Sequence, residues 1–454
     1  MSSGAGGRCI DRFLIHAPQY GPEIGDRHCT SWPRCMRRGA VFLAILATWS
    51  GDKGGLLVNA VLWLAGASLV AWIGLLVVWG FFWWPAPRLT AKRETSPSED
   101  SRFPSVAAVI PARNEAEILP ESLPSVLGQE YDGPFRVVLV DDRSDDGTEA
   151  AARTAAEQAG SQDRLTVLRG EPLREGWSGK VWAMHQGTAS AGDADWIWLT
   201  DADIAHDPWV LEALVELAER EGRDLVSTMA TLRIESAWDR LLIPSFVYFF
   251  AKLYPFRFVS NPRRRTAGAA GGCILVRREQ LERAGGIAAI RGALIDDCAL
   301  GRLIKRSGRS TWLGFSKGVR SLRGYGTLRS VWDMVARSAY TQLGHSPFLL
   351  VGTVLGMLFL YALPPVICVW GAIAALLGVT GGAMAATLGG AAWALMAGSF
   401  LPMLHHHRAG WWMAPLLPLA AVLYTLMTLS SAWRHARGRG GAWKGRTYSG
   451  RGAS

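Results

Sequence analysis

The sequence predicts an α/β domain with a mostly parallel sheet and transmembrane helices on both sides of it. Short apolar runs alternate with helical periodicity between residues 104 and 336, which is typical of βαβ units. Long uncharged runs lie before and after this region, and 49% of the 454 residues are hydrophobic. That share exceeds what an ordinary water-soluble surface requires.

A first transmembrane helix is predicted at residues 55–84. Leu56–Trp84 contains no charged residue, and about 20 apolar residues suffice to cross a bilayer. Residues 1–54 form a polar, Gly-rich extension that we expect to be disordered, with Met36 as an alternative translation start. Residues 85–103 form a linker rich in Pro, Ser and charge.

Each element of the α/β domain follows from its pattern. The expected strands are buried apolar runs at 106–110, 136–140, 165–168, 196–200 and 225–229. The expected helices are 118–127, 148–159, one from about 180, and 209–220, with Asp207 as N-cap of the last. Ligands of such sheets bind at the carboxyl ends of the strands, so the loops there should hold the site.

Four carboxylates lie within six residues at Asp141–Asp146, directly after the strand 136–140. Carboxylates this close repel each other unless hydrogen-bond donors or a cation bind them. A solvated loop that caps the next helix is one interpretation. The other is that Asp142 accepts a hydrogen bond from a nucleobase or a ribose hydroxyl.

Two further acidic pairs follow later in the chain. Asp201 and Asp203 come after the strand 196–200, and their side chains project to the same side of an extended chain. They are thus suitable oxygen ligands for Mg²⁺ or Mn²⁺; alone, a D-x-D pattern is also common in structural loops. Asp296 and Asp297 begin a helix, where they are either capping residues or include a general base, Asp297.

The ordered set of these motifs resembles the family 2 inverting glycosyltransferases with a GT-A fold. The residues that carry the resemblance are Pro111-Ala112-Arg113-Asn114-Glu115, Asp141–Thr148, Gly179-Lys180, Asp201-Ala202-Asp203 and Asp296-Asp297. Within that family the chain is most similar to the hopene-associated glycosyltransferases of hopanoid biosynthesis, through Gly176–Ala183, the arrangement of spans and the tail Trp443–Tyr448. The resemblance implies a GT-A domain at residues 104–336.

The resemblance also implies a role for each residue of the site. Pro111, Ala112, Glu115 and Asp142 would hold the nucleoside of a nucleotide-sugar, by default a UDP-sugar, and Lys180 and Asp201 would support the donor. Asp203, with Asp201, would bind the divalent metal, Mg²⁺ or Mn²⁺. Asp297 would be the catalytic base, and Gly271, Gly272 and Asp296 would face the acceptor.

The expected acceptor is a membrane lipid hydroxyl, with a hopanoid as the suspected lipid. A polyprenyl-phosphate glycosyltransferase is the alternative, and Arg263-Arg264-Arg265 could supply cations for its phosphate acceptor. A processive polysaccharide synthase is less favoured, because Arg337–Gln342 stands where such enzymes carry Gln-x-x-Arg-Trp. The aromatic segment Leu241–Phe258 is either core or a surface in the bilayer interface through which the lipid would arrive.

The charge distribution favours a membrane partner and not nucleic acid. The net charge is +10, but the basic residues crowd the borders of the apolar segments, where anionic headgroups attract them. Four basic residues follow the first span, so the positive-inside rule places the catalytic domain in the cytoplasm. The expected location is the bacterial inner membrane, as a multi-pass protein.

The C-terminal spans do not add up to an even number. Interfacial and transmembrane helices are expected at residues 337–433, with crossings at 348–380, 384–404 and 411–433, followed by a basic tail at 434–454. Three crossings would export a tail whose charge favours the cytoplasm. Either Pro364-Pro365 splits the first segment into two short spans, or one segment lies in the interface.

Overall fold

A computed structural model describes residues 52–91, 103–438, 442–443 and 446–447. The predicted extension 1–54 and its alternative start Met36 lie almost entirely outside the described residues, as does most of the linker and of the basic tail. From Val58 onward the chain forms one structural unit.

The predicted mostly parallel sheet is confirmed. Nine strands form one sheet in the order β1-β9-β7-β8-β5-β2-β3-β4, with β6 paired to β9. Neighbouring strands are parallel except at β8, which runs antiparallel to β5 and β7, and at β6. The strands are β1 Arg88–Leu89, β2 Val106–Ala112, β3 Phe135–Asp141, β4 Leu165–Arg169, β5 Trp196–Leu199, β6 Ile204–His206, β7 Leu225–Thr231, β8 Ile274–Arg277 and β9 Thr311–Ser321.

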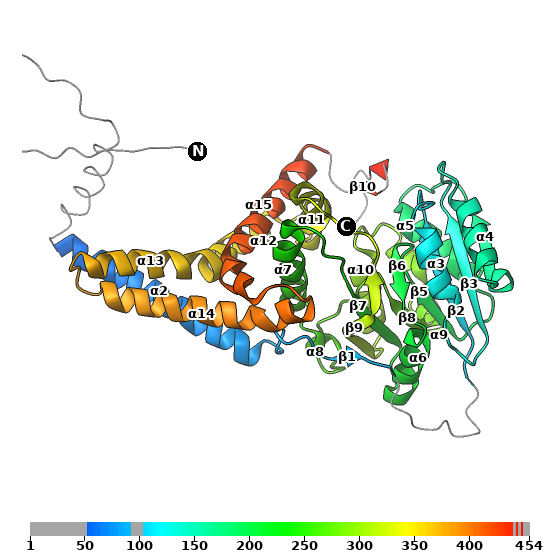
Figure 1. The fold of residues 1–454 in the computed structure, drawn as a ribbon, viewed down its shortest axis with the longest axis horizontal. Coiled ribbons are helices and arrows are strands. Elements are labelled where there is room, and N and C mark those ends of the chain that lie inside the picture. Colours follow the sequence, from blue (N-terminus) through cyan, green and yellow to red (C-terminus); the bar gives the residue numbers. More distant parts are fainter. Residues whose placement is uncertain (1–51, 92–102, 439–441, 444–445, 448–454) are drawn as a thin grey trace, which may run out of the picture. The chain divides into compact units, whose positions relative to one another are not determined.

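Helices cover both faces of this sheet (Figure 1). Alternate residues of β2 point to opposite faces, so Ala108 packs with α3, α4 and α6 while Val109 packs with α5, α9 and α10. Both faces are therefore apolar, as is usual for parallel strands. These helices are α3 Leu119–Leu127, α4 Thr148–Gln158, α5 Gly179–Ala189, α6 Val210–Glu221, α9 Arg278–Arg283 and α10 Asp296–Arg306, with short 3₁₀ turns η1 Gln162–Arg164 and η2 Ile287–Ile290.

The prediction that Asp207 caps the helix 209–220 is wrong. Helix α6 has Trp209 at its N-cap, with no side-chain cap. The Asp207 carboxylate pairs instead with the Arg320 guanidinium on β9. A long-range ion pair has thus replaced the local hydrogen bond that the sequence pattern indicated.

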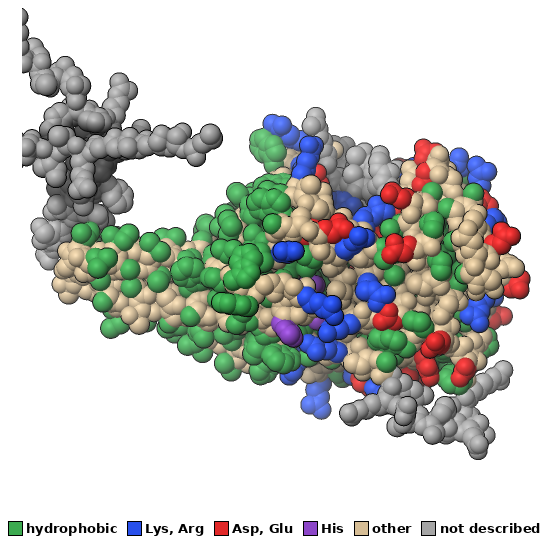
Figure 2. All heavy atoms as spheres, viewed as in Figure 1, with side chains coloured by type: hydrophobic (Ala, Val, Ile, Leu, Met, Phe, Trp, Pro, Cys, Tyr) green, Lys and Arg blue, Asp and Glu red, His purple; other side chains and the backbone are tan. Residues whose placement is uncertain are grey.

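The apolar runs form helices that are long enough to cross a membrane. Among the described residues there are four such candidates, at Gly55–Val78, Pro347–Leu376, Gly382–His406 and Trp411–Ala436. Hydrophobic side chains cover the surface of this part of the chain, whereas charges gather over the α/β part (Figure 2). The helices are α2 Asp52–Val78, α12 Pro347–Met357, η3 Leu358–Ala362, α13 Leu363–Leu376, α14 Gly382–His406, η4 Trp411–Leu416 and α15 Leu417–Ala436; β10 Ala442–Trp443 and β11 Arg446–Thr447 pair beyond them.

Pro364 and Pro365 do not split the first C-terminal segment into two spans. They stand in the first turn of α13, where a missing N–H is tolerated, and the single π-helical turn η3 joins α13 to α12. Residues 347–376 therefore form one continuous apolar stretch. The alternative of two short spans within this segment is therefore not favoured, and the number of membrane crossings stays a prediction.

The segment Leu241–Phe258 lies mostly inside the protein. Helix α7 (Ala237–Leu253) and the short α8 (Phe256–Val259) join a core shared with α11 (Leu328–Gln342), α14 and α15. The Tyr248 hydroxyl lies 2.6 Å from the Ser399 hydroxyl, and the Tyr424 hydroxyl donates to the Leu242 carbonyl over 2.9 Å. The α/β part and the apolar helices thus share a packed interior.

Candidate active site

The carboxyl ends of three neighbouring strands carry the first predicted residues of the site. The strands β5, β2 and β3 are neighbours in the sheet, so their carboxyl ends lie side by side. Asp201 follows the end of β5, Pro111 lies at the end of β2, and Asp142 follows the end of β3. Ala112 pairs with Asp141 in the register of β2 and β3. The edge at which ligands of parallel sheets bind is therefore the edge where these residues lie.

One cavity of about 1220 Å³ opens at this edge and continues along the apolar side chains of α7, α11 and α12. Most of the predicted site residues line it, namely Pro111, Glu115, Lys180, Asp201, Asp203, Gly271, Gly272, Asp296 and Asp297. The residues predicted for donor, metal and acceptor thus face a single space. Ala112 and Asp142 are not among the lining residues.

Asp142 is buried behind the cavity wall, with only 1% of its surface exposed. The Arg113 guanidinium covers it, donating to the Asp142 carbonyl over 2.5 Å and lying 3.8 Å from the carboxylate. A nucleoside that reached Asp142 would have to share or displace this arginine. The predicted nucleoside contact of Asp142 stays a prediction.

Two other carboxylates of the 141–146 cluster hold the loop itself. Asp141 accepts from the Ser144 amide over 2.9 Å, and Asp146 accepts from the Ala116 and Thr148 amides over 3.0 Å each. The interpretation of this cluster as a capping loop thus describes these two residues. Hydrogen-bond donors of the loop stabilise the charges of these two carboxylates.

Lys180 joins the two later acidic pairs. Its ammonium lies 2.7 Å from an Asp201 oxygen and 3.1 Å from an Asp296 oxygen. Burial alone would lower the pKa of Lys180, but the two carboxylates raise it above its usual value. The alternative interpretation of Asp296 as an N-cap is wrong, because its carboxylate faces Lys180 and the N-cap position is Ile295.

Asp297 is held by backbone donors at the start of α10. Its two oxygens accept from the Cys298 amide over 2.6 Å and from the Gly271 amide over 3.0 Å. Burial, with the charge of Asp296, raises the pKa of Asp297 to about 6. Near neutral pH the group is thus an ionised carboxylate of raised basicity, which suits a general base.

Gly271 leaves room at the centre of the cluster. A Cβ atom added there would lie 3.5 Å from both an Asp297 oxygen and the Lys180 nitrogen, and 3.6 Å from an Asp201 oxygen. The glycine therefore keeps open the space that these three groups surround. A reacting atom placed there would meet a base, a cation and a potential metal ligand together.

Arg323 is a residue of the site that the sequence did not predict. It follows β9, and its guanidinium pairs with Glu115 and lies 3.4 Å from an Asp203 oxygen. It thus connects Glu115, a predicted nucleoside contact, with Asp203, the predicted metal ligand. Arg323 and Glu115 are 208 positions apart in the chain. No local pattern marks an arginine with such distant partners.

The carboxylates of the cavity suit a hard divalent cation that takes its other ligands from a bound diphosphate. Mg²⁺ is commonly held by one or two carboxylates together with substrate phosphates, and Asp201 and Asp203 offer that set. No group of three acidic, His or Cys side chains that could hold a metal without substrate exists among the described residues. Asp201 and Asp203 would thus supply protein ligands of the metal, and a bound diphosphate would add further ones.

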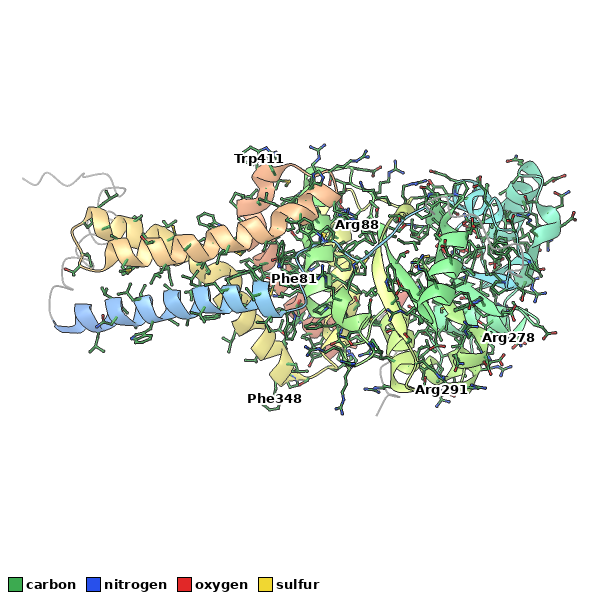
Figure 3. All side chains as sticks on the ribbon, turned by 90° about the horizontal axis from the view of Figure 1, so that it is seen from below. Phe81, Arg88, Arg278, Arg291, Phe348 and Trp411 are labelled. Atoms are coloured by element: carbon green, nitrogen blue, oxygen red, sulfur yellow. The ribbon has the colours of Figure 1, made fainter. Side chains whose placement is uncertain are left out.

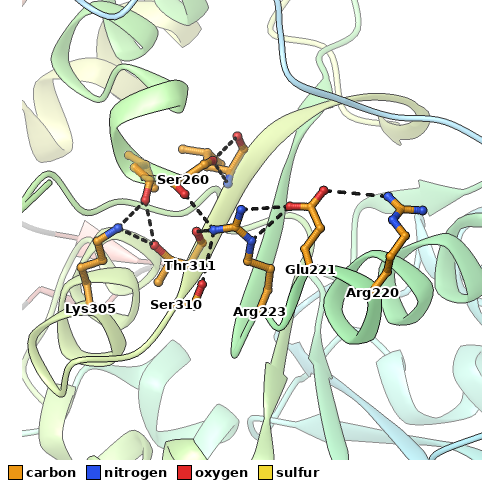
Figure 4. Close-up of polar contacts among 9 residues, drawn as sticks. Arg220, Glu221, Arg223, Ser260, Lys305, Ser310 and Thr311 are labelled. Carbon is orange, nitrogen blue, oxygen red and sulfur yellow. Dashed lines mark hydrogen bonds and ion pairs between the residues drawn. The ribbon is translucent and has the colours of Figure 1, made fainter. Parts of the chain in front are cut away.

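The arginines predicted to serve a phosphate acceptor lie elsewhere. Arg263 lines a second pocket of about 650 Å³ with Arg223 and Arg257. The loop that carries it is fixed by hydrogen bonds from Arg223 to the Ser260 carbonyl (2.8 Å) and from Lys305 to the Asn261 carbonyl (2.9 Å), part of the network in Figure 4. The cations for a phosphate acceptor must be sought among other residues.

A comparison with protein families finds one match, in the α/β part of the chain. Residues 107–285 match the model of the family described as glycosyl transferase family 2. The match runs from β2 to α9 and so includes Lys180, Asp201, Asp203 and Gly271, but it ends before Asp296. The α/β part of the chain is thus similar to family 2 glycosyltransferases over these residues, and the predicted GT-A fold is confirmed.

Curated relatives match over the same part of the chain. An undecaprenyl-phosphate 4-deoxy-4-formamido-L-arabinose transferase of Pseudomonas syringae is 29% identical over 178 residues, which are 37% of this chain and 46% of the relative. A protein with the same name from Pseudomonas aeruginosa is 31% identical over 175 residues, 37% and 45% of the two chains. The chain spans about half the length of the curated relatives it matches.

Solved structures of sugar transferases are similar at a lower level. A mannosyltransferase from Pyrobaculum calidifontis, in complex with GDP-Man and Mn²⁺, is 19% identical with a TM-score of 0.47, over 82% of this chain and 98% of that one. The Mycobacterium tuberculosis glucosyl-3-phosphoglycerate synthase with Mn²⁺ and UDP-glucose is 21% identical with a TM-score of 0.34, over 53% and 78%.

We predict that Arg323→Met increases the affinity for Mn²⁺ several-fold in the absence of nucleotide. The Arg323 guanidinium and a metal would compete for the same Asp203 oxygen, so removal of the arginine frees the ligand. Titration with Mn²⁺ by calorimetry measures the change. Arg320→Met is the matched control, since Arg320 is also near the end of β9 but pairs with Asp207. Unchanged Mn²⁺ affinity in Arg323→Met would show that no metal binds at Asp203.

Proposed function

We propose that this protein is a metal-dependent glycosyltransferase that moves a sugar from a nucleoside diphosphate donor to a lipid acceptor in the membrane, with polyprenyl phosphate as the acceptor class. The observation that carries the proposal is the cavity itself. At one end it presents Lys180, Asp201 and Asp297, and along its length it presents Phe246, Phe250 and other apolar side chains. Such a space fits a charged donor and a lipid at once.

The donor would bind at the polar end. Asp203, with Asp201, would hold Mg²⁺ or Mn²⁺, which supplies positive charge to the diphosphate when bound. Lys180 adds a fixed cation beside Asp201. The Arg323 guanidinium, now 3.4 Å from an Asp203 oxygen, would exchange this contact for one with a phosphate oxygen of the donor. These residues would stabilise the negative charge of the leaving nucleoside diphosphate. The resemblance to the family makes a UDP-sugar the default donor.

The transfer would be a single displacement. An acceptor oxygen attacks the anomeric carbon of the sugar while the bond from that carbon to the diphosphate oxygen breaks, so the configuration at the carbon inverts. The electron pair of the broken bond leaves with the nucleoside diphosphate. When the acceptor is a hydroxyl, its proton passes to Asp297.

The choice between acceptor classes rests on two observations. The relatives of this chain are named as undecaprenyl-phosphate sugar transferases, which favours polyprenyl phosphate and gives no support to the hopanoid acceptor expected from the sequence. Asp297 favours a lipid hydroxyl as the second candidate acceptor. A general base that removes the proton of a hydroxyl accelerates its reaction by about 10²–10⁴-fold. It contributes little for a phosphate oxygen, which is already ionised near pH 7.

We also infer that α15 lies along the catalytic side of the membrane and does not cross it. Figure 3 places Phe81 near the end of α2, Phe348 near the start of α12 and Trp411 after α14 at one level along the apolar helices. Helix α15 is also tied to α11: the Ser431 hydroxyl accepts from the Tyr340 amide, and Arg434 lies 2.6 Å from Asp333. With α2, residues 347–376 and α14 as spans, the tail would stay with the catalytic domain in the bacterial cytoplasm.

Asp297→Asn is expected to abolish sugar transfer to a hydroxyl acceptor while UDP still binds, because the base is lost but the donor site is intact. The assay incubates the purified chain with labelled UDP-sugars and, separately, a polyprenyl phosphate and a hopanoid alcohol. Asp333→Asn is the control, since Asp333 also lines the cavity but pairs with Arg434. Label in the phosphate lipid alone supports polyprenyl phosphate; label in neither lipid contradicts the proposed function.

With a hydroxyl acceptor, the acid limb of the pH profile of kcat/KM is expected near pH 6. The active form of Asp297 is the carboxylate, and its pKa is raised to about 6, so activity falls as the pH drops through that value. A steady-state profile from pH 4.5 to 8 measures the limb. Full activity retained down to pH 4.5 would contradict this assignment.

A single cysteine introduced in the basic tail at Ser449 is expected to react with a membrane-impermeant maleimide only after the cytoplasmic side of bacterial vesicles is exposed. A cysteine at Val379, between α13 and α14, is expected to react from the opposite side and is the matched control. Both reporters are made in a variant in which the native cysteines are replaced by serine. Labelling of both positions from the same side would contradict the inferred topology.

A further inference from the structure

Among the described residues, five basic side chains line the cavity, and two of these form no ion pair with a described carboxylate. Lys180 pairs with Asp201, Arg323 with Glu115, and Arg434 with Asp333. The other two are Lys252 and Arg337, for which the described part of the chain shows no ion pair. Arg337 is exposed, so water solvates its charge. Lys252 is only partly exposed, which makes it the exceptional cation.

The ammonium of Lys252 is held in place by aromatic groups. It donates to the Tyr361 hydroxyl over 2.9 Å and lies 4.5 Å from the centre of the Tyr361 ring and 5.9 Å from that of Phe249. Burial lowers the pKa of Lys252 to about 8, so the group is still mostly charged at pH 7. A cation removed from water without a counter-charge costs free energy, and an anionic ligand in the cavity would offset that cost.

Lys252 stands where the first apolar helix ends. Its carbonyl accepts from the Trp79 indole over 2.8 Å, one residue beyond α2. Tyr361, its partner, packs edge-on against Trp72 of α2 at 5.4 Å between ring centres. Indole side chains at the end of a span mark the headgroup level of a bilayer, which is also the level of lipid phosphates.

The same cavity leads from Lys252 to the reacting groups. Lys252, Tyr254 and Asp297 all line it. The Tyr254 hydroxyl contacts the Cys298 thiol, and Cys298 is adjacent to Asp297. Leu253, Phe250 and Leu360 supply apolar lining on the membrane side. A lipid phosphate that enters beside α2 would thus meet Lys252 before it reached Asp297.

We propose that Lys252, held by Tyr361, is the cation of a capture site for the phosphate group of an acceptor lipid, at the membrane end of the catalytic cavity. This inference rests on the proposed function for the identity of the lipid. The site binds the phosphate monoester by charge and its hydrocarbon chain by the apolar wall, and it concentrates the acceptor ahead of the reaction. Loss of the lysine therefore weakens acceptor binding and leaves the chemical step intact.

The test is a binding measurement that needs no catalysis. The purified full chain, in nanodiscs of zwitterionic phosphatidylcholine, is titrated by calorimetry with a short polyprenyl phosphate and with the matching neutral polyprenol. We expect the parent to bind the phosphate at least tenfold more tightly than the alcohol. Lys252→Met and Lys252→Gln lose this preference, and Lys252→Arg keeps most of it. Arg337→Gln, the matched cavity variant, keeps it fully, and UDP affinity is unchanged in every variant, which shows that each is folded.

The proposal would be overturned if the parent showed no preference for the phosphate. It would also be overturned if Lys252→Met retained the preference or if Arg337→Gln lost it. A preference abolished by excess phosphatidylglycerol would assign the site to a bilayer phospholipid and would equally overturn it. The sugar-transfer assay tests the proposed function independently of this binding measurement. A Lys252-dependent preference without any sugar transfer would uphold the capture site and reject the proposed function.

Discussion

The arrangement of the candidate site depends on one ammonium group between two carboxylates. Lys180 begins α5 and lies within 3.1 Å of both Asp201, at the end of β5, and Asp296, at the start of α10. Without this cation the negative charges of Asp201, Asp296 and Asp297 would repel one another by several kcal/mol at an effective dielectric constant of about 20. Lys180 therefore lets loops that are far apart in the sequence converge, and it leaves Asp297 close to a positive charge without a direct ion pair.

A second constraint is the core that the α/β part shares with the apolar helices. Helix α7 packs against α11, α14 and α15, so the wall of the cavity is made partly from the sheet domain and partly from helices that can lie in a membrane. A donor soluble in water and an acceptor dissolved in lipid meet only if one space is open to both. The cavity that contains both Asp203 and Leu360 has this property, and Lys252 lies in the part that the lipid would enter first.

The sequence was informative where local physics decides the structure. Buried apolar runs predicted five of the nine strands of the sheet to within two residues, and the carboxyl-end rule placed Asp201 and Asp203 at one edge of the sheet. The sequence did not predict β1, β6, β8 and β9. It was less informative where a distant partner decides. Asp296 and Asp207 stand where helix caps are expected, but their carboxylates form ion pairs instead. Asp296 pairs with Lys180, and Asp207 pairs with Arg320. Arg323 was not predicted, and Lys252 was expected only as an interfacial anchor of the segment 241–258, because partners of both residues lie more than 100 residues away. The aromatic segment 241–258 could be core or surface until its packing partners were known.

The most direct test of this account is a cryo-electron microscopy structure of the chain in nanodiscs with UDP, Mn²⁺ and a polyprenyl phosphate. The account predicts metal density at Asp203 between the protein and the diphosphate, with lipid density in the same cavity between α7 and α11. Nucleotide and lipid bound in two separate cavities, or a diphosphate with no metal near Asp203, would contradict it.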